Sequence, residues 1–253
     1  MIDLHIHVLP GIDDGPDDAE QTVLLARACV ADGVTALAAT SHVSETYPTT
    51  VAQLAEALKT AREAIAQAGV PIELHAGAEV AIDQLAKLPD ADLKRLSIAE
   101  NGYLLLECPY AAWPMQLDDQ LARLGDLGLR AVLAHPERSA GVQTPEGLDR
   151  LTNLAQRGLL VQVTAGSLTG RFGSTAKRTA RELLDREAVH LLASDAHNTN
   201  RRPPRLSEAA GELGDQALTR WLTQDVPQAI VKGATIPERP PRQQKRRLFG
   251  RKR

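Results

Sequence analysis

The chain has 253 residues, of which 43% are apolar and 24% are charged, enough to build the core of one large domain or two small ones. This composition excludes a disordered chain, a collagen, a coiled coil and a disulfide-stapled miniprotein, since only two cysteines occur. The formal net charge is −3, but residues 1–238 hold 21 basic and 32 acidic residues, a net charge of −11. An acidic surface of this kind is a poor match for nucleic acid.

Short apolar runs alternate with stretches of helical periodicity along most of the chain. In chain order, the pattern predicts a strand at Ile2–His7, a helix at Ala19–Asp32, a strand at Ala36–Thr40, a helix at Val51–Ala68, strands at Ile72–Glu79 and Tyr103–Glu107, a helix at Gln116–Leu127, a strand at Ala131–His135, a helix at Pro145–Gln156, a strand at Leu160–Val163, a helix at Thr175–Arg186 and a strand at Val189–Ser194. About seven strand–helix units predict an α/β fold with a parallel sheet, and a (β/α) barrel fits them better than an open sheet.

The end of the chain differs from the rest. Residues 239–253 carry eight Lys or Arg and no acid, and residues 238–253 contain prolines without apolar periodicity. We therefore expect a single domain at residues 1–237 and a basic, flexible tail at residues 238–253. The charge of the tail suits an anionic membrane surface or an acidic partner, and a purely solubilising role is the alternative. Because the chain shows no apolar run of membrane-spanning length and no secretory signal, the expected location is the cytoplasm, including the inner face of the membrane.

Histidines and acids gather near the predicted C-terminal ends of the strands, where a βα barrel builds its active site. His5 and His7 are two residues apart, so both rings point to one face of the first strand, and Asp195 and His197 share this spacing. Any one such residue could be a structural group, but two such pairs at strand ends favour a metal centre. Imidazole and carboxylate together suit Mn, Fe or Zn. The candidate ligands are His5, His7, Asp14, His42, Glu79, Glu107, His135, Asp195 and His197.

Several short segments carry a family resemblance: MIDLHIHVLPGIDDG, ATSH, GAE, LLLE, AHPER and ASDAHN. Together they resemble the PHP (polymerase and histidinol phosphatase) superfamily, and more narrowly its bacterial manganese-dependent protein-tyrosine phosphatases of capsule and exopolysaccharide operons. The likeness extends from Ile2 to about Pro204, and the LPGIDDG segment is its most branch-specific part. It implies a distorted (β/α)7 barrel of the PHP type that holds three divalent metal ions, best matched by Mn²⁺ with Fe or Zn as alternatives.

The resemblance also implies how the ligands divide. His5, His7 and Asp195 would hold one metal, and Glu79 would bridge it to a second metal completed by Glu107 and His135. The third would be held by Asp14, His42 and His197. Two arginines a few residues beyond ligands, Arg138 and Arg202, are the catalytic candidates for binding phosphate oxygens, because a guanidinium fits phosphate through two hydrogen bonds. Arg201 is one residue off the pattern and is the weaker candidate.

This resemblance implies a metal-dependent protein-tyrosine phosphatase, in which a metal-activated hydroxide hydrolyses phosphotyrosine. The implied partner is a tyrosine-phosphorylated protein, a membrane-associated tyrosine autokinase that controls capsular or exopolysaccharide synthesis and export. Two alternatives stay open. One is another PHP phosphoesterase, such as a histidinol-phosphate phosphatase or a phosphodiesterase. The other is a binding module that acts through the basic tail.

Cysteine-based phosphatase chemistry is not expected, because no arginine lies six residues after Cys29 or Cys108, and both read as small buried residues. His75 lies about 13 Å along its strand from Glu79, so we expect a structural or surface role for it. His190 has the opposite parity to Asp195, which predicts the same kind of role. Phe172 could either stack on a phenolic substrate ring or pack against the adjacent helix.

Overall fold

The computed structural model describes residues 1–241, and it contains two parallel sheets. One sheet has the strand order β1-β2-β4, formed by Ile2–Ile6, Ala36–Ala39 and Glu73–His75. The other has the order β3-β5-β6-β7-β8-β9, formed by His42–Val43, Glu79–Ala81, Tyr103–Glu107, Arg130–Ala134, Leu160–Thr164 and Leu191–Ala193. Every paired strand in both sheets runs parallel to its neighbour.

The two sheets meet at both of their ends. At one end, β2 leads into β3 and β4 leads into β5 after only a few residues, so each pair occupies one strand position. At the other end, Ile6 bridges Ala196 in parallel, and the Asp195 amide donates to the His5 carbonyl at 2.8 Å. The strands therefore occupy seven parallel positions that follow one another around a ring.

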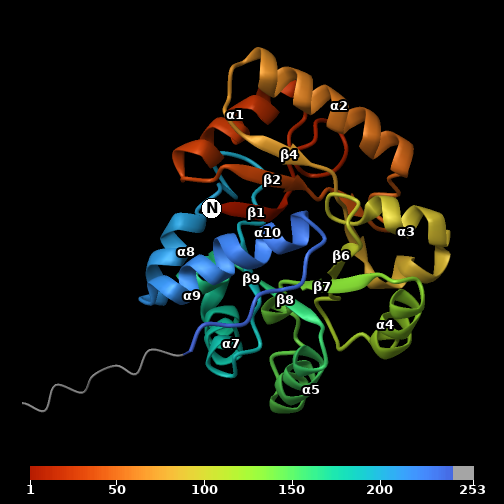
Figure 1. The fold of residues 1–253 in the computed structure, drawn as a ribbon, viewed down its shortest axis with the longest axis vertical. Helices are drawn as coiled ribbons and strands as arrows, with labels where there is room; N and C mark the ends of the chain where they lie inside the picture. The colour runs from red at the N-terminus through yellow and green to blue at the C-terminus, as the bar shows by residue number, and fades with distance from the viewer. Residues whose placement is uncertain (242–253) are drawn as a thin grey trace, which may run out of the picture.

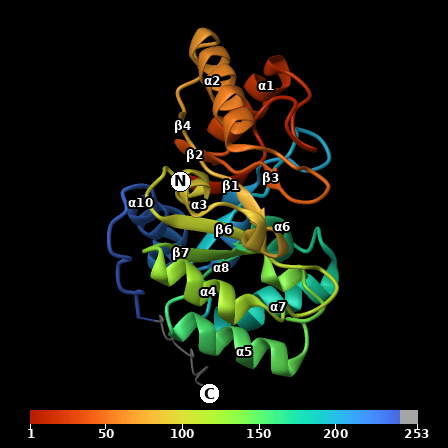
Figure 2. The same cartoon turned by 90° about the vertical axis from the view of Figure 1, so that its right-hand side faces the viewer.

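Helices cover the outside of the ring (Figures 1 and 2). α1 and α2 lie side by side on one flank, and α4, α5 and α7 lie on the opposite flank, while α10 lies against β1. The α-helices are α1 (Ala19–Ala31), α2 (Val51–Gln67), α3 (Asp90–Leu96), α4 (Leu117–Asp126), α5 (Pro145–Gln156), α6 (Ala165–Thr169), α7 (Gly173–Asp185), α8 (Leu206–Leu213), α9 (Gln216–Arg220) and α10 (Val226–Val231). Two 3₁₀ turns, Ile82–Lys87 and Pro136–Arg138, and a π-helical segment, Trp221–Asp225, complete the set.

Local sequence explains where the longer helices begin. Thr50 and Gln53 form a reciprocal capping box at the start of α2, in which each side chain accepts from the other residue's backbone amide. Asp18 caps α1 through the Gln21 amide, and Thr144 caps α5 ahead of Pro145 at the first helical position. These caps supply hydrogen-bond acceptors for helix amides that have no partner within the helix.

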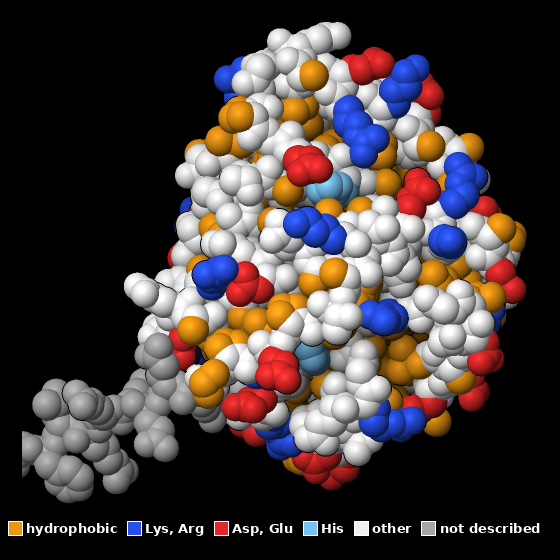
Figure 3. Space-filling view, viewed as in Figure 1, with side chains coloured by type: hydrophobic (Ala, Val, Ile, Leu, Met, Phe, Trp, Pro, Cys, Tyr) orange, Lys and Arg blue, Asp and Glu red, His pale blue; other side chains and the backbone are white. Residues whose placement is uncertain are grey.

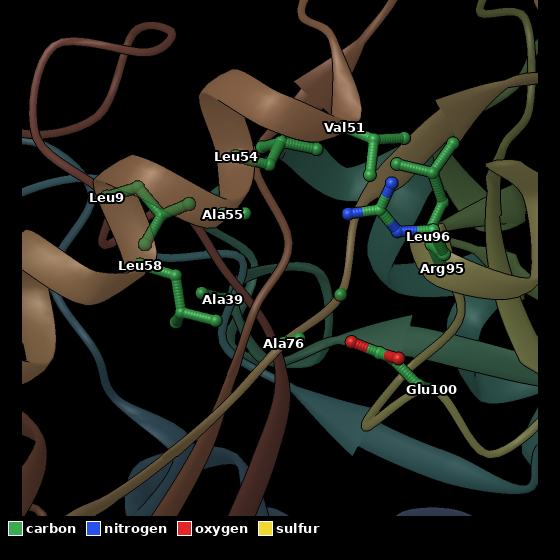
Figure 4. Close-up of a pocket in the computed structure, with 11 residues that line it drawn as sticks. Leu9, Ala39, Val51, Leu54, Ala55, Leu58, Ala76, Arg95, Leu96 and Glu100 are labelled. Atoms are coloured by element: carbon green, nitrogen blue, oxygen red, sulfur yellow. The ribbon is translucent and has the colours of Figure 1, made fainter.

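The strands are buried between the helices and the interior of the ring. Leu104, Leu105 and Leu106 of β6 are fully buried, as an apolar strand covered on both faces requires. A small cavity of about 60 Å³ lies beneath α2, lined by Leu54 and Leu58 of this helix and by Leu9 (Figure 4). Most of its lining is apolar, so this part of the core is held by packing.

The predicted α/β fold with parallel strands is confirmed, with two local differences in the strands. The expected strand Ile72–Glu79 is divided into β4 and β5 around Gly77, where a Cβ atom would lie 3.3 Å from Thr40 Cγ2. The expected strand Ala36–Thr40 is followed by the short β3. Both breaks occur where the chain passes from one sheet to the other.

The end of the described chain contacts the domain. Trp221 Nε1 donates to the Pro237 carbonyl at 3.0 Å, and an Arg239 guanidinium nitrogen donates to the Val189 carbonyl at 2.6 Å. Most of the predicted tail, 238–253, lies outside the described residues, which end at Pro241. Within those described residues, no helix combines the length and apolar character needed to cross a bilayer.

Candidate metal centre

The nine candidate ligands lie at or near strand ends, with His42 and Glu79 as the first residues of β3 and β5. His5 belongs to β1, His42 to β3, Glu79 to β5 and Glu107 to β6, and the others lie in the loops that follow strands. Their ligand atoms form overlapping groups in which all atoms lie within 4.8 Å of one another. The groups are His7, Asp14, His42 and His197; His5, His135 and Asp195; His5, His7 and Glu79; and His42, Glu79 and Glu107. The ring thus brings residues 5 to 197 into one continuous cluster of imidazoles and carboxylates.

Glu79 is the centre of this cluster. Its carboxylate is fully buried, with imidazole nitrogens of His135, His42, His5 and His7 at 2.8, 3.0, 3.3 and 3.4 Å. Glu79 Oε2 and His42 Nδ1 are both buried and both lack a hydrogen-bond partner, although they are only 3.0 Å apart. Unpartnered buried polar atoms that face one another fit a cation that both would coordinate. The donor set of imidazole nitrogen and carboxylate oxygen suits a divalent transition metal.

The distances refine the division of ligands that the resemblance implied. Asp14, His42 and His197 lie together as expected, and His7 joins them. Glu79 contributes to two of the groups, as do His5, His7 and His42. His135 groups with His5 and Asp195, whereas Glu107 groups with His42 and Glu79.

Two further side chains orient the histidines. Asp13 Oδ2 lies 2.7 Å from His7 Nδ1 and accepts from the His42 amide at 2.9 Å. Gln162 Oε1 lies 2.9 Å from His5 Nδ1. Each contact leaves the Nε2 atom of its histidine facing the cluster, which is the usual role of a residue behind a metal ligand. Sequence reasoning did not assign these roles, although Asp13 lies in the LPGIDDG segment and Gln162 is a polar residue within a predicted buried strand.

The backbone is strained at two candidate ligands. His135 has a φ of +33° and Asp195 a φ of +54°, in the left-handed region that non-glycine residues seldom adopt. His135 directly follows β7, and Asp195 lies two residues after the end of β9. Such strain persists at functional sites when the surrounding structure enforces it. Here it turns both side chains into the ring.

The charges within the cluster shift one another's pKa values. Burial opposes a charge on His7, but Asp13 and Glu79 outweigh it and raise the pKa of His7 to about 10. Burial also opposes the Glu79 charge, yet His5, His135 and His42 hold the pKa of this carboxyl well below its ordinary value. Burial and the nearby Glu79 charge raise the pKa of Glu107. The Glu79 carboxyl therefore stays negatively charged, and positively charged imidazolium groups compensate this charge. A bound cation would supply that positive charge in their place.

Both predicted arginines reach the cluster. Nitrogens of Arg138 and Arg202 lie 2.8 and 2.6 Å from the same atom, Asp195 Oδ2. Arg138 is also held between two aromatic rings, 5.0 Å from the Tyr110 centroid and 4.3 Å from that of Phe172. Phe172 packs closely on Gly166, where a Cβ atom would lie 2.6 Å from its ring. Its observed role is thus to support Arg138.

The remaining residues that the sequence singled out lie outside the cluster. Cys29 and Cys108 are buried, and burial raises the pKa of both thiols, that of Cys108 to about 11. His75 pairs with Glu73 at 3.4 Å. His190 Nδ1 accepts from the Val161 amide at 3.2 Å. Buried neutral thiols make poor nucleophiles, in agreement with the absence of the cysteine phosphatase signature.

An open cavity of about 420 Å³ lies beside the cluster. His42 and Glu107 form part of its wall, and Tyr47 and Tyr110 line it. Tyr47 stacks on His42 with ring centroids 5.5 Å apart, and Tyr110 stacks on His135 at 5.8 Å. The cavity thus offers aromatic walls directly next to candidate metal ligands.

Comparison with known proteins agrees with this geometry. The profile of the family described as capsular polysaccharide synthesis, CpsB/CapC, matches residues 1–231. The chain is 32% identical to the tyrosine-protein phosphatase YwqE of Bacillus subtilis over 99% of each chain. It is 29% identical to the tyrosine-protein phosphatase CpsB of Streptococcus pneumoniae over 83% of this chain and 88% of CpsB.

Solved structures give the same result. A structure from a crystallographic study of YwqE from Bacillus subtilis and CpsB from Streptococcus pneumoniae, described there as metal-dependent tyrosine phosphatases, matches with a TM-score of 0.84. The identity is 30%, and the match covers 97% of this chain and 100% of the other. The phosphotriesterase from Mycobacterium tuberculosis matches with a TM-score of 0.56 and 10% identity, over 92% of this chain and 94% of the other. This second likeness shows the fold alone.

Proposed function

Because the chain belongs to the CpsB/CapC family of capsular polysaccharide synthesis, we propose that it hydrolyses phosphotyrosine in a protein substrate by metal-dependent chemistry. One observation carries this assignment: the buried Glu79 carboxylate and the imidazoles around it form a cation-binding cluster beside two phosphate-binding candidates, Arg138 and Arg202. A divalent cation held in this cluster, next to two guanidiniums, would stabilise the negative charge of a phosphoryl group during its transfer.

The proposal extends to the fold type and to the metals. The ring of seven parallel strand positions supports a distorted (β/α)7 barrel of the PHP type. Three divalent ions, best matched by Mn²⁺, would be held by the nine ligands His5, His7, Asp14, His42, Glu79, Glu107, His135, Asp195 and His197. When bound, such ions make hydroxide available near neutral pH and offset negative charge on the phosphoryl group.

The protein's own side chains bind and orient the substrate phosphate. Arg138 and Arg202 both donate to Asp195 Oδ2, and their remaining guanidinium N–H groups would be available to phosphate oxygens. The rings of Tyr110 and Phe172 hold the Arg138 plane in place. Asp13 and Gln162 fix the ring orientation of His7 and His5.

The aromatic ring of the substrate fits the cavity of about 420 Å³. Tyr47 and Tyr110 line it and supply apolar ring faces for stacking. Burial raises the pKa of Tyr110, so its phenol stays neutral at physiological pH and adds no negative charge beside the phosphate. A phenolate leaves more readily than an alkoxide because the phenol pKa is near 10, so this site suits an aryl phosphate.

The family also supports a biological setting. We propose that the substrate is a membrane-associated tyrosine autokinase of capsular or exopolysaccharide synthesis, and that the chain acts on it at the inner face of the membrane. The basic residues from Arg239 onward would strengthen that encounter through their charge.

The test combines metal analysis with peptide hydrolysis. Protein purified without chelator should carry two to three metals per chain and release phosphate from a phosphotyrosine peptide. Chelator should abolish turnover, and Mn²⁺ should restore it. Metal content without hydrolysis of the phosphotyrosine peptide would overturn the proposed substrate, and hydrolysis that persists in metal-free protein would overturn the mechanism.

A further inference from the structure

The end of the strand ring that holds the candidate ligands is here called the mouth. A further cavity lies on the side of the mouth formed by the segments after β8 and β9. Its volume is about 130 Å³. Its wall includes Gly166 and Ser194, and four guanidiniums line it: those of Arg171, Arg201, Arg202 and Arg205. Asp195 also lines this cavity, which therefore adjoins the proposed phosphate site.

The cavity carries more positive charge than its neighbours neutralise. Among the described residues that line the cavity, Asp195 is the one carboxylate, and it already accepts hydrogen bonds from Arg138 and Arg202. Arg205 pairs with Glu208 at 3.3 Å, and both side chains are about half exposed, so this pair is weak. Within residues 1–241, no carboxylate lies within ion-pair distance of Arg171 or Arg201.

The opposite side of the mouth has the opposite charge. The cavity beside Tyr47 and Tyr110 is lined by Glu45, Asp83 and Glu107, and by no Lys or Arg of the described chain. The molecular face turned toward the viewer in Figure 3 instead mixes basic and acidic side chains. The two cavities thus differ in charge, one lined by arginines and the other by carboxylates, on the side of the molecule where a substrate peptide would lie.

We propose that the cavity lined by Arg171, Arg201, Arg202 and Arg205, here called the arginine subsite, binds an anionic side chain that flanks the substrate phosphotyrosine. This inference rests on the proposed phosphatase function and adds a sequence preference to it. A carboxylate and a second phosphate share the chemistry that guanidinium groups recognise. Because the other side of the mouth is acidic, the preferred anion lies on one side of the phosphotyrosine along the peptide and is disfavoured on the other.

A peptide series tests this preference. Each peptide holds one phosphotyrosine in a neutral background, with a single Glu at one of the three positions before or after it. A second arm places phosphotyrosine at the best of these positions, which separates the carboxylate from the phosphate source. Glu on the favoured side should raise kcat/KM about tenfold over the neutral peptide, mainly through KM, and 0.5 M salt should remove most of the gain.

The double variant Arg171→Gln/Arg205→Gln links the preference to the subsite. It should lose the tenfold gain and retain turnover of the neutral peptide within about twofold. Arg157→Gln/Arg178→Gln removes the same charge from exposed positions outside the cavity and serves as the matched control. Calorimetric binding of the same peptides with a phosphonomethyl group in place of the phosphate ester gives a readout independent of turnover.

The outcomes distinguish a failure of the arginine subsite from a failure of the proposed phosphatase function. Equal kcat/KM and equal binding for neutral and Glu-containing peptides, or an identical gain in wild-type protein and the Arg171→Gln/Arg205→Gln variant, would overturn the subsite. Failure of wild-type protein with Mn²⁺ to hydrolyse any of the peptides would overturn the proposed function, and the binding measurement would still decide whether the arginines select an anion.

Discussion

Asp13 Oδ2 lies 2.7 Å from His7 Nδ1, so an acid outside the candidate ligand groups sets which nitrogen of His7 faces the cluster. The same oxygen accepts from the His42 amide at 2.9 Å, which ties the loop after β1 to β3. One carboxylate therefore positions two candidate ligands from neighbouring strand positions.

We expect Asp13→Asn to weaken metal binding about 10- to 100-fold, the usual effect of losing the partner of a ligating histidine. Asparagine keeps an acceptor but loses the charge that raises the His7 pKa. A Mn²⁺ titration of metal-free protein measures the effect. Asp17→Asn, an exposed acid in the same loop, is the control and should leave the affinity unchanged. Equal affinities of wild-type protein and Asp13→Asn would show that Asp13 does not position His7.

Gln162 should act in the same way on His5. Gln162→Met removes the oxygen that lies 2.9 Å from His5 Nδ1 in a fully buried setting, and we expect kcat/KM for a phosphotyrosine peptide to fall about 10- to 100-fold. Gln162→Glu restores an acceptor and should recover part of the activity at saturating Mn²⁺. If both variants lose activity equally, the role of Gln162 is packing and not orientation.

His42→Ala and Glu107→Ala should each abolish phosphotyrosine hydrolysis with little loss of stability. Both side chains are partly exposed at the mouth, so their removal leaves no closed cavity in the core. Circular dichroism melting of the metal-free variants measures stability, and peptide turnover measures activity. Retained turnover in either variant would remove that residue from the ligand set.

His190 predicts a pH effect far from the cluster. Burial and then the nearby Arg239 charge lower the pKa of His190 to about 4 in the folded chain, while an unfolded histidine titrates near 6.5. The unfolded chain thus binds a proton first as pH falls, so the stability linked to His190 is complete above pH 6.5 and is lost toward pH 4. Between pH 8 and pH 5 the loss is about 2 kcal/mol.

The variant His190→Asn keeps an acceptor for the Val161 amide and removes the titration. Urea unfolding of metal-free protein at both pH values should show a smaller decrease in the variant by about this amount. A decrease of the same size in both proteins would exclude His190 as the source.

The alternation of strands and helices and the histidine spacing were enough to predict the α/β fold and the residues that converge. His5-x-His7 and Asp195-x-His197 are local patterns, and strand periodicity alone places each pair on one face. The split of one predicted strand into β4 and β5 was missed because it depends on Gly77 approaching Thr40, a contact between distant parts of the chain.

The supporting residues were harder to predict for the same reason. Gln162 contacts a histidine 157 positions away, and nothing in its own neighbourhood distinguishes it from any polar residue in a strand. Arg138 fits the pattern by position, but its aromatic clamp of Tyr110 and Phe172 joins three separate loops. Local spacing predicts which side chains share a strand face, whereas the partners behind them are set by tertiary packing.

The closure of the strand ring between Ile6 and Ala196 sets the order in which this enzyme can become active during synthesis. The first candidate ligands, His5 and His7, leave the ribosome at the start of translation, but Asp195 and His197 join them only after the ninth strand has been made. Pairing the two ends of so long a segment is a slow, late step in folding. A nascent or C-terminally truncated chain that stops before β9 therefore cannot assemble the candidate metal centre.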